Sequence, residues 1–170
     1  DQFILATGAW TPAIGRQLGV RIPVQPGKGY SITMDRPAIC PAIPCYLVER
    51  NTVVTPWQSG YRLGGTMEFS GFNDQLNERR LSNLETSAAL YLKTPLGRRV
   101  TERWTSLRPM SVDDLPIIDR VPQLGNLFIA TGHGMLGLST ATGTGQLVSD
   151  MILGRHPPFD PGPFSLKRFG

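Results

Sequence analysis

Two short apolar runs in the chain lead into almost identical glycine turns. Residues 4–8 read Ile-Leu-Ala-Thr-Gly, and residues 128–132 read Phe-Ile-Ala-Thr-Gly. Apolar runs of this length before glycine are typical of buried strands. We therefore predict buried strands at residues 2–6 and 127–130, parallel to each other in one α/β sheet. Their carboxyl ends, with both Ala-Thr-Gly turns, are expected to face one ligand crevice.

A helix is predicted behind each turn. Thr11 and Pro12 suit the N-cap and first position of a short helix that ends before Gly19. A longer helix is expected after Gly137, and Gly154 provides its stop. Apolar and small residues recur there at a period of 3.6 and predict one core-facing side: Ala141, Gly145, Val148 and Ile152.

The middle of the chain has a different pattern, with short β-branched and aromatic segments separated by Pro and Gly. It predicts a largely antiparallel sheet with a hairpin turn at Gln58-Ser59-Gly60. The expected strands are 20–33, 46–49, 52–55, 61–68 and 100–108. One helix is predicted at 77–93, with Leu81, Leu84, Ala88 and Tyr91 on its buried side and Glu78, Arg79, Asn83 and Thr86 on its solvated side.

These elements predict an α+β fold in which an antiparallel-sheet lobe is inserted into an α/β lobe. We assign residues 1–19 and 109–154 to the discontinuous α/β lobe, 20–108 to the inserted lobe and 155–170 to a C-terminal tail. A crevice between two lobes is a usual place for a small-molecule site. Because the chain opens directly on a strand pattern, we expect an upstream segment to precede it.

Composition places the 170 residues among globular proteins, with 40% hydrophobic and 18% charged residues. No apolar run is long enough for a membrane span, and the start lacks the basic region of a signal peptide. The net charge of +4 is spread thinly, which argues against a nucleic-acid partner. Cys40 and Cys45 do not have a zinc or redox spacing; reduced, packed thiols and a local disulfide both remain open.

Gly132, Gly134 and Gly137 spell the dinucleotide fingerprint G-x-G-x-x-G. The surrounding pattern does not fit it, because a proline-rich stretch follows the helix and neither Asp150 nor Asp160 is placed to hold a ribose. Two other interpretations remain. The loop is either a turn that lets strand and helix pack closely, or a source of free N–H groups for an electron-rich ligand.

The stretch from Trp104 to Asp119, followed by Thr-Gly-His-Gly-Met-Leu-Gly at 131–137, resembles the FAD-dependent D-amino acid oxidase superfamily, closest to its D-amino acid dehydrogenases. Supporting motifs are Ala-Thr-Gly-Ala-Trp at 6–10, Pro-Gly-Lys-Gly-Tyr-Ser at 26–31, Leu-Gly-Gly-Thr-Met-Glu at 63–68 and Arg168-Phe169. The resemblance implies an enzyme that passes hydride from a carbon bearing an amine to FAD. It also implies that the α/β lobe binds FAD and that the antiparallel lobe binds substrate.

In that family the dinucleotide fingerprint and ribose acid lie in an N-terminal segment, which this sequence lacks. The resemblance therefore implies a C-terminal portion that is inactive by itself and needs the missing segment to bind FAD. No cysteine lies near the glycine loop, so FAD is expected to be non-covalent. Hydride removal from a neutral amine depends on orientation, so no catalytic nucleophile and no metal are nominated.

Arg108 is the expected substrate anchor, since its guanidinium fits a carboxylate bidentately and the resemblance implies that role. The alternatives are a pair with Asp113 or Asp114, or a partly buried arginine at a sheet end. The position of Asp114 is often Gly in related dehydrogenases. Tyr30 is a candidate wall above the flavin, although plain core packing is the commoner role of a strand tyrosine.

The resemblance also implies two sets of cofactor contacts. One is the backbone around the flavin ring, where fixed donors favour the reduced state: Gly132, His133, Gly134, Met135, Leu136, Gly137 and Leu138. The other, on the adenosine or diphosphate side, is Ala6, Thr7, Gly8 and Trp10, with strand-end packing as its alternative. His133 is expected to act through its main chain, because its ring has no partner evident in sequence.

The expected partners are a small amino-acid substrate and an electron acceptor that the sequence does not identify. The expected location is cytoplasmic, with peripheral contact at the inner face of a membrane as an option. Two other classes of function remain open. One is a non-catalytic binding or assembly subunit of the same fold, and the other is a phosphate-binding module that uses the 132–138 loop alone.

Overall fold

The computed structural model describes residues 1–170, which divide into two compact units. Unit 1 contains residues 1–27 and 108–170, and unit 2 contains residues 28–107. The chain therefore leaves unit 1 once and returns to it.

Unit 1 has a three-stranded sheet in the order β1-β8-β7. Its strands are β1 (Phe3–Leu5), β7 (Ile117–Arg120) and β8 (Leu127–Thr131). β1 and β8 are parallel, as predicted, and their register sets Ile4 beside Phe128 and Leu5 beside Ile129. The two similar segments are thus direct neighbours. β7 was not predicted; it runs antiparallel to β8.

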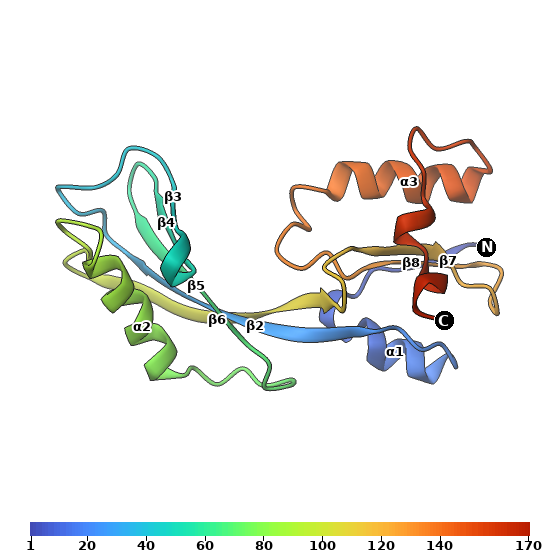
Figure 1. The fold of residues 1–170 in the computed structure, drawn as a ribbon, viewed down its shortest axis with the longest axis horizontal. Helices are drawn as coiled ribbons and strands as arrows, with labels where there is room; N and C mark the ends of the chain where they lie inside the picture. Colours follow the sequence, from blue (N-terminus) through green and yellow to red (C-terminus); the bar gives the residue numbers. More distant parts are fainter. The chain divides into compact units, whose positions relative to one another are not determined.

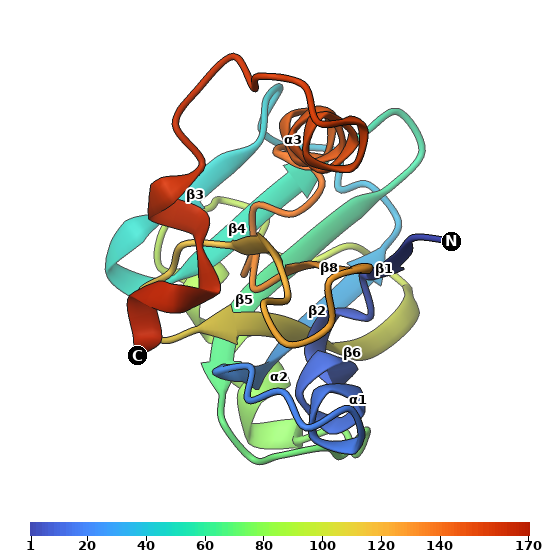
Figure 2. The same cartoon turned by 90° about the vertical axis from the view of Figure 1, so that its right-hand side faces the viewer.

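Helices lie on both sides of this sheet (Figure 1): α1 (Thr11–Gln17) and α3 (Ala141–Leu153). Ile117 and Ile129 face a core with Leu5, Val20 and Ile22, against which Ile14 of α1 packs. The other face joins Ile118 to α3 through Leu147 and Val148. Figure 2 looks along α3 and shows the C-terminal segment running back from it. That segment has two short 3-10 helices, Gly162–Phe164 and Leu166–Phe169.

Unit 2 contains most of a five-stranded sheet in the order β3-β4-β5-β2-β6. The strands are β2 (Val24–Met34), β3 (Cys45–Leu47), β4 (Thr52–Pro56), β5 (Tyr61–Glu68) and β6 (Val100–Ser111). The pairs β3–β4, β4–β5 and β2–β5 are antiparallel, as expected. The predicted hairpin turn at 58–60 is confirmed, because Pro56 pairs with Tyr61 and Trp57 N–H donates to the carbonyl of Gly60.

The single helix of unit 2 is α2 (Glu78–Ala89), and its predicted buried side is confirmed for Leu81, Leu84 and Ala88. The side chain of Asn77 caps its start by accepting from the N–H groups of Arg79 and Arg80. Tyr91 was expected on the same side but lies beyond the helix end and is exposed. The helix packs on the sheet side formed by Tyr30, Ile32, Met34, Val54 and Leu63.

The predicted boundary at residue 19 is wrong, because Val20, Ile22 and Val24 are buried in the core of unit 1. The tail 155–170 is also part of this unit, since Phe164, Leu166 and Phe169 pack on its two cores. The predicted strand at residues 2–6 is also less buried than expected. In β1 only Leu5 is buried, because β1 is an edge strand with β8 as its one neighbour.

The helix after the glycine loop begins at Ala141, with Thr140 as N-cap. Gly154 ends it in the left-handed conformation at φ +64°, as its predicted stop requires. Of the predicted core side, Val148 is buried and Ile152 packs on the core, but Ala141 and Gly145 are exposed. The predicted helical period is therefore correct for the second half of α3, which covers the sheet. It is wrong for the first half, which is exposed.

Candidate functional site

The two Ala-Thr-Gly turns of unit 1 are joined by a chain of hydroxyl groups. The Thr131 hydroxyl, at the end of β8, donates to the carbonyl of Gly8 at 3.0 Å. Thr11 Oγ lies 3.0 Å from Thr131 Oγ, and Thr7 Oγ lies 3.1 Å from Thr11 Oγ. Thr11 and Thr131 are buried. The strand ends therefore form one fixed edge, as the parallel register predicted.

Gly132 and Gly134 follow in the left-handed conformation, at φ +76° and +53°. A Cβ on Gly132 would also come within 3.3 Å of the Ser111 side chain, so glycine suits this position on two grounds. The loop then folds on itself, because Leu136 N–H donates to the carbonyl of His133. Thr140 returns both its N–H and its hydroxyl to the carbonyl of Leu136.

The same loop is tied to the strand that carries Arg108. Gly134 N–H donates to the carbonyl of Pro109 at 2.9 Å, and Met110 and His133 form an antiparallel bridge. Both segments belong to unit 1. The structure therefore brings together the expected carboxylate anchor and the expected flavin loop, which are 24 residues apart in sequence.

The surface of this loop is open. Met135, Leu136 and Leu138 are 69%, 62% and 93% exposed, and the N–H groups of Gly137 and Leu138 have no acceptor within the chain. Free amides beside apolar side chains suit the edge of a flat ring with hydrogen-bond acceptors. The residues present therefore fit the ring end of a flavin. These amides belong to the loop itself, because α3 begins only at Ala141.

His133 has a partner that the sequence did not reveal. Its Nε2 lies 2.9 Å from Thr144 Oγ, one turn into α3. Burial lowers the pKa of the His133 imidazole from its ordinary value of 6.5. The ring thus ties the loop to the helix. No sequence spacing pointed to it, because the contact depends on how the loop folds back.

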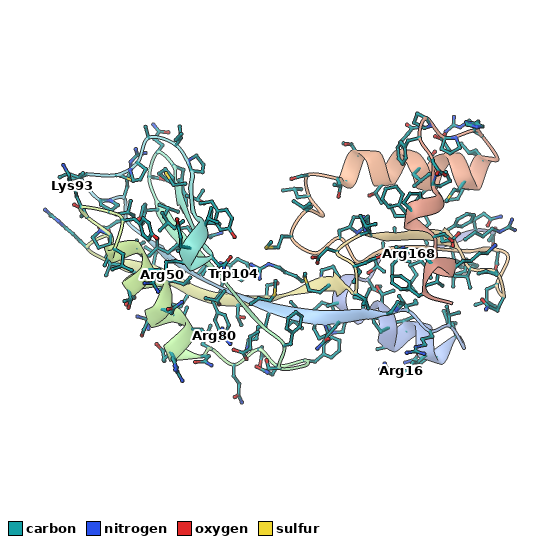
Figure 3. The ribbon with its side chains drawn as sticks, in the orientation of Figure 1. Arg16, Arg50, Arg80, Lys93, Trp104 and Arg168 are labelled. Atoms are coloured by element: carbon teal, nitrogen blue, oxygen red, sulfur yellow. The ribbon has the colours of Figure 1, made fainter.

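Arg108 is half-buried on β6, and burial lowers the pKa of its guanidinium. The alternative in which Arg108 pairs with Asp113 is not what the structure shows. Asp113 instead receives two hydrogen bonds from Arg168, Nε to Oδ2 at 2.7 Å and Nη2 to Oδ1 at 3.0 Å. Figure 3 labels Arg168 in the C-terminal segment.

Arg168 also donates to the carbonyls of Leu115 and Ser165, so it fixes the loop 112–116 between β6 and β7. Within that loop Asp114 adopts φ +59°, the left-handed conformation that favours glycine. The turn is therefore the one that a glycine would make. The clamp was missed from sequence because its partners are 55 residues apart.

The residues nominated for the adenosine side lie at the start of unit 1. Ala6, Thr7 and Trp10 are exposed at the end of β1, and Gly8 opens a 3-10 helix (Gly8–Trp10) at φ +55°. Gly8 also receives the hydroxyl of Thr131. Its packing role is therefore established, while contact of this set with a cofactor stays a prediction.

Tyr30 belongs to unit 2, where it is 2% exposed within the core beneath α2. Its hydroxyl donates to Glu68 at 2.9 Å, and burial followed by this bond raises its pKa to about 12. The ammonium of the buried Lys28 lies 5.3 Å from the Tyr30 ring and donates to Asn73 Oδ1 and the carbonyl of Gln75. Plain core packing, the alternative considered from sequence, describes Tyr30 well; substrate contact stays a prediction.

No group of three or more His, Cys, Asp and Glu side chains in residues 1–170 could hold a metal ion. None of the helices has both the length and the apolar character to cross a membrane.

The family model described as DAO, FAD dependent oxidoreductase, matches residues 1–151. The chain belongs to this family of FAD-dependent oxidoreductases. It is 38% identical to a D-amino acid dehydrogenase of Xanthobacter autotrophicus over 99% of its own length. It is also 35% identical to an uncharacterized oxidoreductase of Halorhodospira halophila, of which it covers 79%.

Among solved structures, a glycine oxidase from Geobacillus kaustophilus superposes with a TM-score of 0.90 and 26% identity, over 97% of this chain and 45% of that one. This similarity bears out the mixed α+β fold with antiparallel sheets. The chain spans about 40% of the length of the Xanthobacter dehydrogenase. The activity of a whole protein is therefore a matter for proposal.

Proposed function

We propose that this chain is the part of an FAD-dependent amino-acid dehydrogenase that carries the substrate anchor and the flavin-ring loop. The observation that carries the proposal is the hydrogen bond from Gly134 N–H to the carbonyl of Pro109, beside Arg108. It holds a carboxylate-binding side chain and a row of free amides on one rigid piece of unit 1. Similarity to a D-amino acid dehydrogenase supports D-amino acids as the first substrates to test.

In this proposal each group has one task. Bound FAD would accept the hydride from the carbon that bears the amine. The amides of the 132–138 loop hold the acceptor atoms of the ring, and non-covalent binding fits the absence of cysteine from the loop. Arg108 orients the substrate by its carboxylate, because a half-desolvated guanidinium binds an anion more strongly than an exposed one.

Ala6, Thr7, Gly8 and Trp10 are proposed on the adenosine or diphosphate side of the same cofactor. The exposure of Ala6, Thr7 and Trp10 at a parallel strand end supports this assignment. Tyr30 is proposed for the substrate side of the site, where it also fixes Glu68 and the strand pair β2–β5.

The native protein that contains this chain provides the test. We expect it to purify with the visible absorption of a flavin and to reduce an artificial electron dye when given D-amino acids. Sarcosine, glycine and hydroxyproline complete the substrate panel. A flavin-free protein without dye reduction would favour a non-catalytic binding or assembly subunit. Tight binding of phosphate or ADP by the 170-residue chain alone, measured by calorimetry, would favour the phosphate-binding module.

We also propose peripheral contact with an anionic membrane through the end of unit 2. Ile39 and Ile43 are 61% and 70% exposed on the loop between β2 and β3. At the base of this loop the Asp35 N–H donates to the carbonyl of Arg99, and the Arg99 N–H donates to the Asp35 carboxylate. The side chains of Arg98 and Arg99 are exposed beside it. Exposed aliphatic side chains on a loop with two arginines at its base suit anionic lipid.

Flotation of the native protein with vesicles tests that contact. Binding to phosphatidylglycerol vesicles is expected, with loss of binding in the double variant Arg98→Glu, Arg99→Glu. Equal binding of that variant, or no binding to any vesicle, would exclude this surface.

A further inference from the structure

Cys40 and Cys45 stand at the two ends of the segment Pro-Ala-Ile-Pro. The chain bends at residues 42 and 43, and β3 begins at Cys45. A bend between two prolines turns the segment back on itself and leaves it few alternative conformations. The segment that joins the two cysteines is therefore short and conformationally restricted.

Both cysteines pack against the same hydrophobic core. Each thiol is free and half-buried, and each packs on the core of unit 2 that contains Tyr61. The Tyr61 hydroxyl is buried without a hydrogen-bond partner. Burial, and after it the nearby sulfurs of Cys40 and Cys45, raises the pKa of Tyr61 to about 12. The two cysteines and Tyr61 thus belong to one packed region of unit 2.

This pair has no task in the proposed flavin chemistry. The flavin loop and Arg108 belong to unit 1, whereas both cysteines belong to unit 2. The hydrogen bond of Cys45 Sγ to the carbonyl of Ile43 stays within the bend itself. Both sulfurs remain partly accessible, so a small reagent can reach them.

We propose that Cys40 and Cys45 form a redox-active dithiol, which a small-molecule disulfide such as oxidised glutathione converts to a local Cys40–Cys45 disulfide. The thiolate of one cysteine attacks the sulfur–sulfur bond of oxidised glutathione and releases one reduced glutathione. The thiolate of the other cysteine then attacks the mixed disulfide and releases the second. Two protein thiols are oxidised, one glutathione disulfide is reduced, and the two thiol protons leave with the two glutathione products.

The folded chain should favour the Cys40–Cys45 disulfide over a mixed disulfide with glutathione. In the folded chain the second thiol acts at the effective concentration of a short, bent linker. In the unfolded chain the same segment samples many more conformations. We therefore expect the folded protein to hold at least about ten-fold more intramolecular than mixed disulfide at equilibrium.

Glutathione redox buffers with the native protein test the proposal. Trypsin cuts after Lys28 and Arg50 but not before Pro37, so one peptide, Gly29 to Arg50, carries both cysteines. The expected result is a peptide lighter by two hydrogen atoms. Cys40→Ser and Cys45→Ser serve as matched controls, each of which should carry one glutathione on the remaining thiol.

Three outcomes would overturn the proposal. One is a peptide with two glutathiones at every redox ratio, and another is a peptide that stays reduced in oxidised buffer. The third is an equal ratio of Cys40–Cys45 disulfide to mixed disulfide in folded protein and in urea. That result would show that the fold does not favour the intramolecular disulfide. Thermal unfolding of the Cys40→Ser variant checks that the controls are folded.

Discussion

Thr131 lies at the end of β8 and donates its hydroxyl to the carbonyl of Gly8, at 3.0 Å and 123 residues away in sequence. This bond makes the carboxyl ends of two parallel strands one structural edge. The glycine loop starts at the next residue, Gly132, so its position is set by the same bond. The arrangement of the candidate site therefore begins with the pairing of two similar strands.

The first prediction removes that hydroxyl. Thr131→Val should lower the free energy of unfolding by about 1 to 2 kcal/mol, because the partly buried carbonyl of Gly8 and the buried hydroxyl of Thr11 each lose a partner. Thr131→Ser keeps the hydroxyl and should cost less. Urea unfolding followed by fluorescence measures both variants. A Thr131→Val variant as stable as the unmodified protein would contradict the role of the hydrogen bond.

The second prediction concerns substrate. In the native protein, Arg108→Leu should raise KM for amino acids by the equivalent of about 2 to 5 kcal/mol, since a charged hydrogen bond to a partly buried carboxylate is lost. Arg16→Leu, an exposed arginine on α1 labelled in Figure 3, is the control and should leave KM unchanged. Steady-state kinetics with the artificial dye measures the effect. An unchanged KM in Arg108→Leu removes this residue from the site.

The third prediction follows from the clamp of Arg168 on Asp113. Hydrogen bonds from Arg168 lower the pKa of the Asp113 carboxyl. A carboxylate with a lowered folded-state pKa stabilises the protein above its unfolded-state pKa, and this stability is lost as pH falls through the folded-state value. Asp113→Asn should therefore cost about 1 kcal/mol at neutral pH and nothing in strong acid.

Urea unfolding from neutral to acid pH measures this difference, with Asp114→Asn as the matched control in the same loop. Parallel curves for Asp113→Asn and the unmodified protein at all pH values would contradict the role of the clamp.

The fourth prediction uses the backbone of Asp114 at φ +59°. Asp114→Gly should be about 1 kcal/mol more stable than Asp114→Ala, because a side chain with Cβ is strained in this conformation and glycine is not. Thermal unfolding of the two variants measures the difference. If alanine is tolerated as well as glycine, the turn in solution differs from the one described.

The fifth prediction is a pH dependence. Burial lowers the pKa of His133, so the unfolded chain takes up this proton at a higher pH than the folded chain does. Stability should therefore fall as pH drops below about 6.5. His133→Gln should reduce this fall, whereas His156→Gln, at an exposed residue, should not. Urea unfolding at several pH values around 6.5 measures this dependence. If the free energy of unfolding of His133→Gln falls with pH as steeply as that of the unmodified protein, His133 is not its source.

Local sequence gave much of the fold, for reasons that particular residues make clear. β5 was predicted with its observed bounds, because alternating Tyr61 and Leu63 and the turn before them are local signals. The stop at Gly154 was equally local, since a left-handed C-cap favours glycine. β7 was missed, because Pro116 precedes only four strand residues whose pairing depends on β8.

The candidate site could be foreseen only in part. Arg108 and the 132–138 loop were nominated from motifs, and their closeness within unit 1 came from the structure. Thr144 as the partner of His133 and Arg168 as the partner of Asp113 were not foreseen. Such contacts have no sequence period, because they depend on where a loop or a tail returns.

The sequence by itself determined that the two similar strands pair in parallel, where glycine allows a left-handed helix stop, and that the chain carries the motifs of an FAD-dependent oxidoreductase. These follow from backbone sterics and from side-chain patterns that act within a few residues. Only the tertiary structure decided that Val20 to Val24 and the C-terminal segment belong to unit 1 and that Tyr30 lies in a core. Burial is a property of the whole packed unit, because an apolar side chain is removed from water only by neighbours that the chain brings from elsewhere.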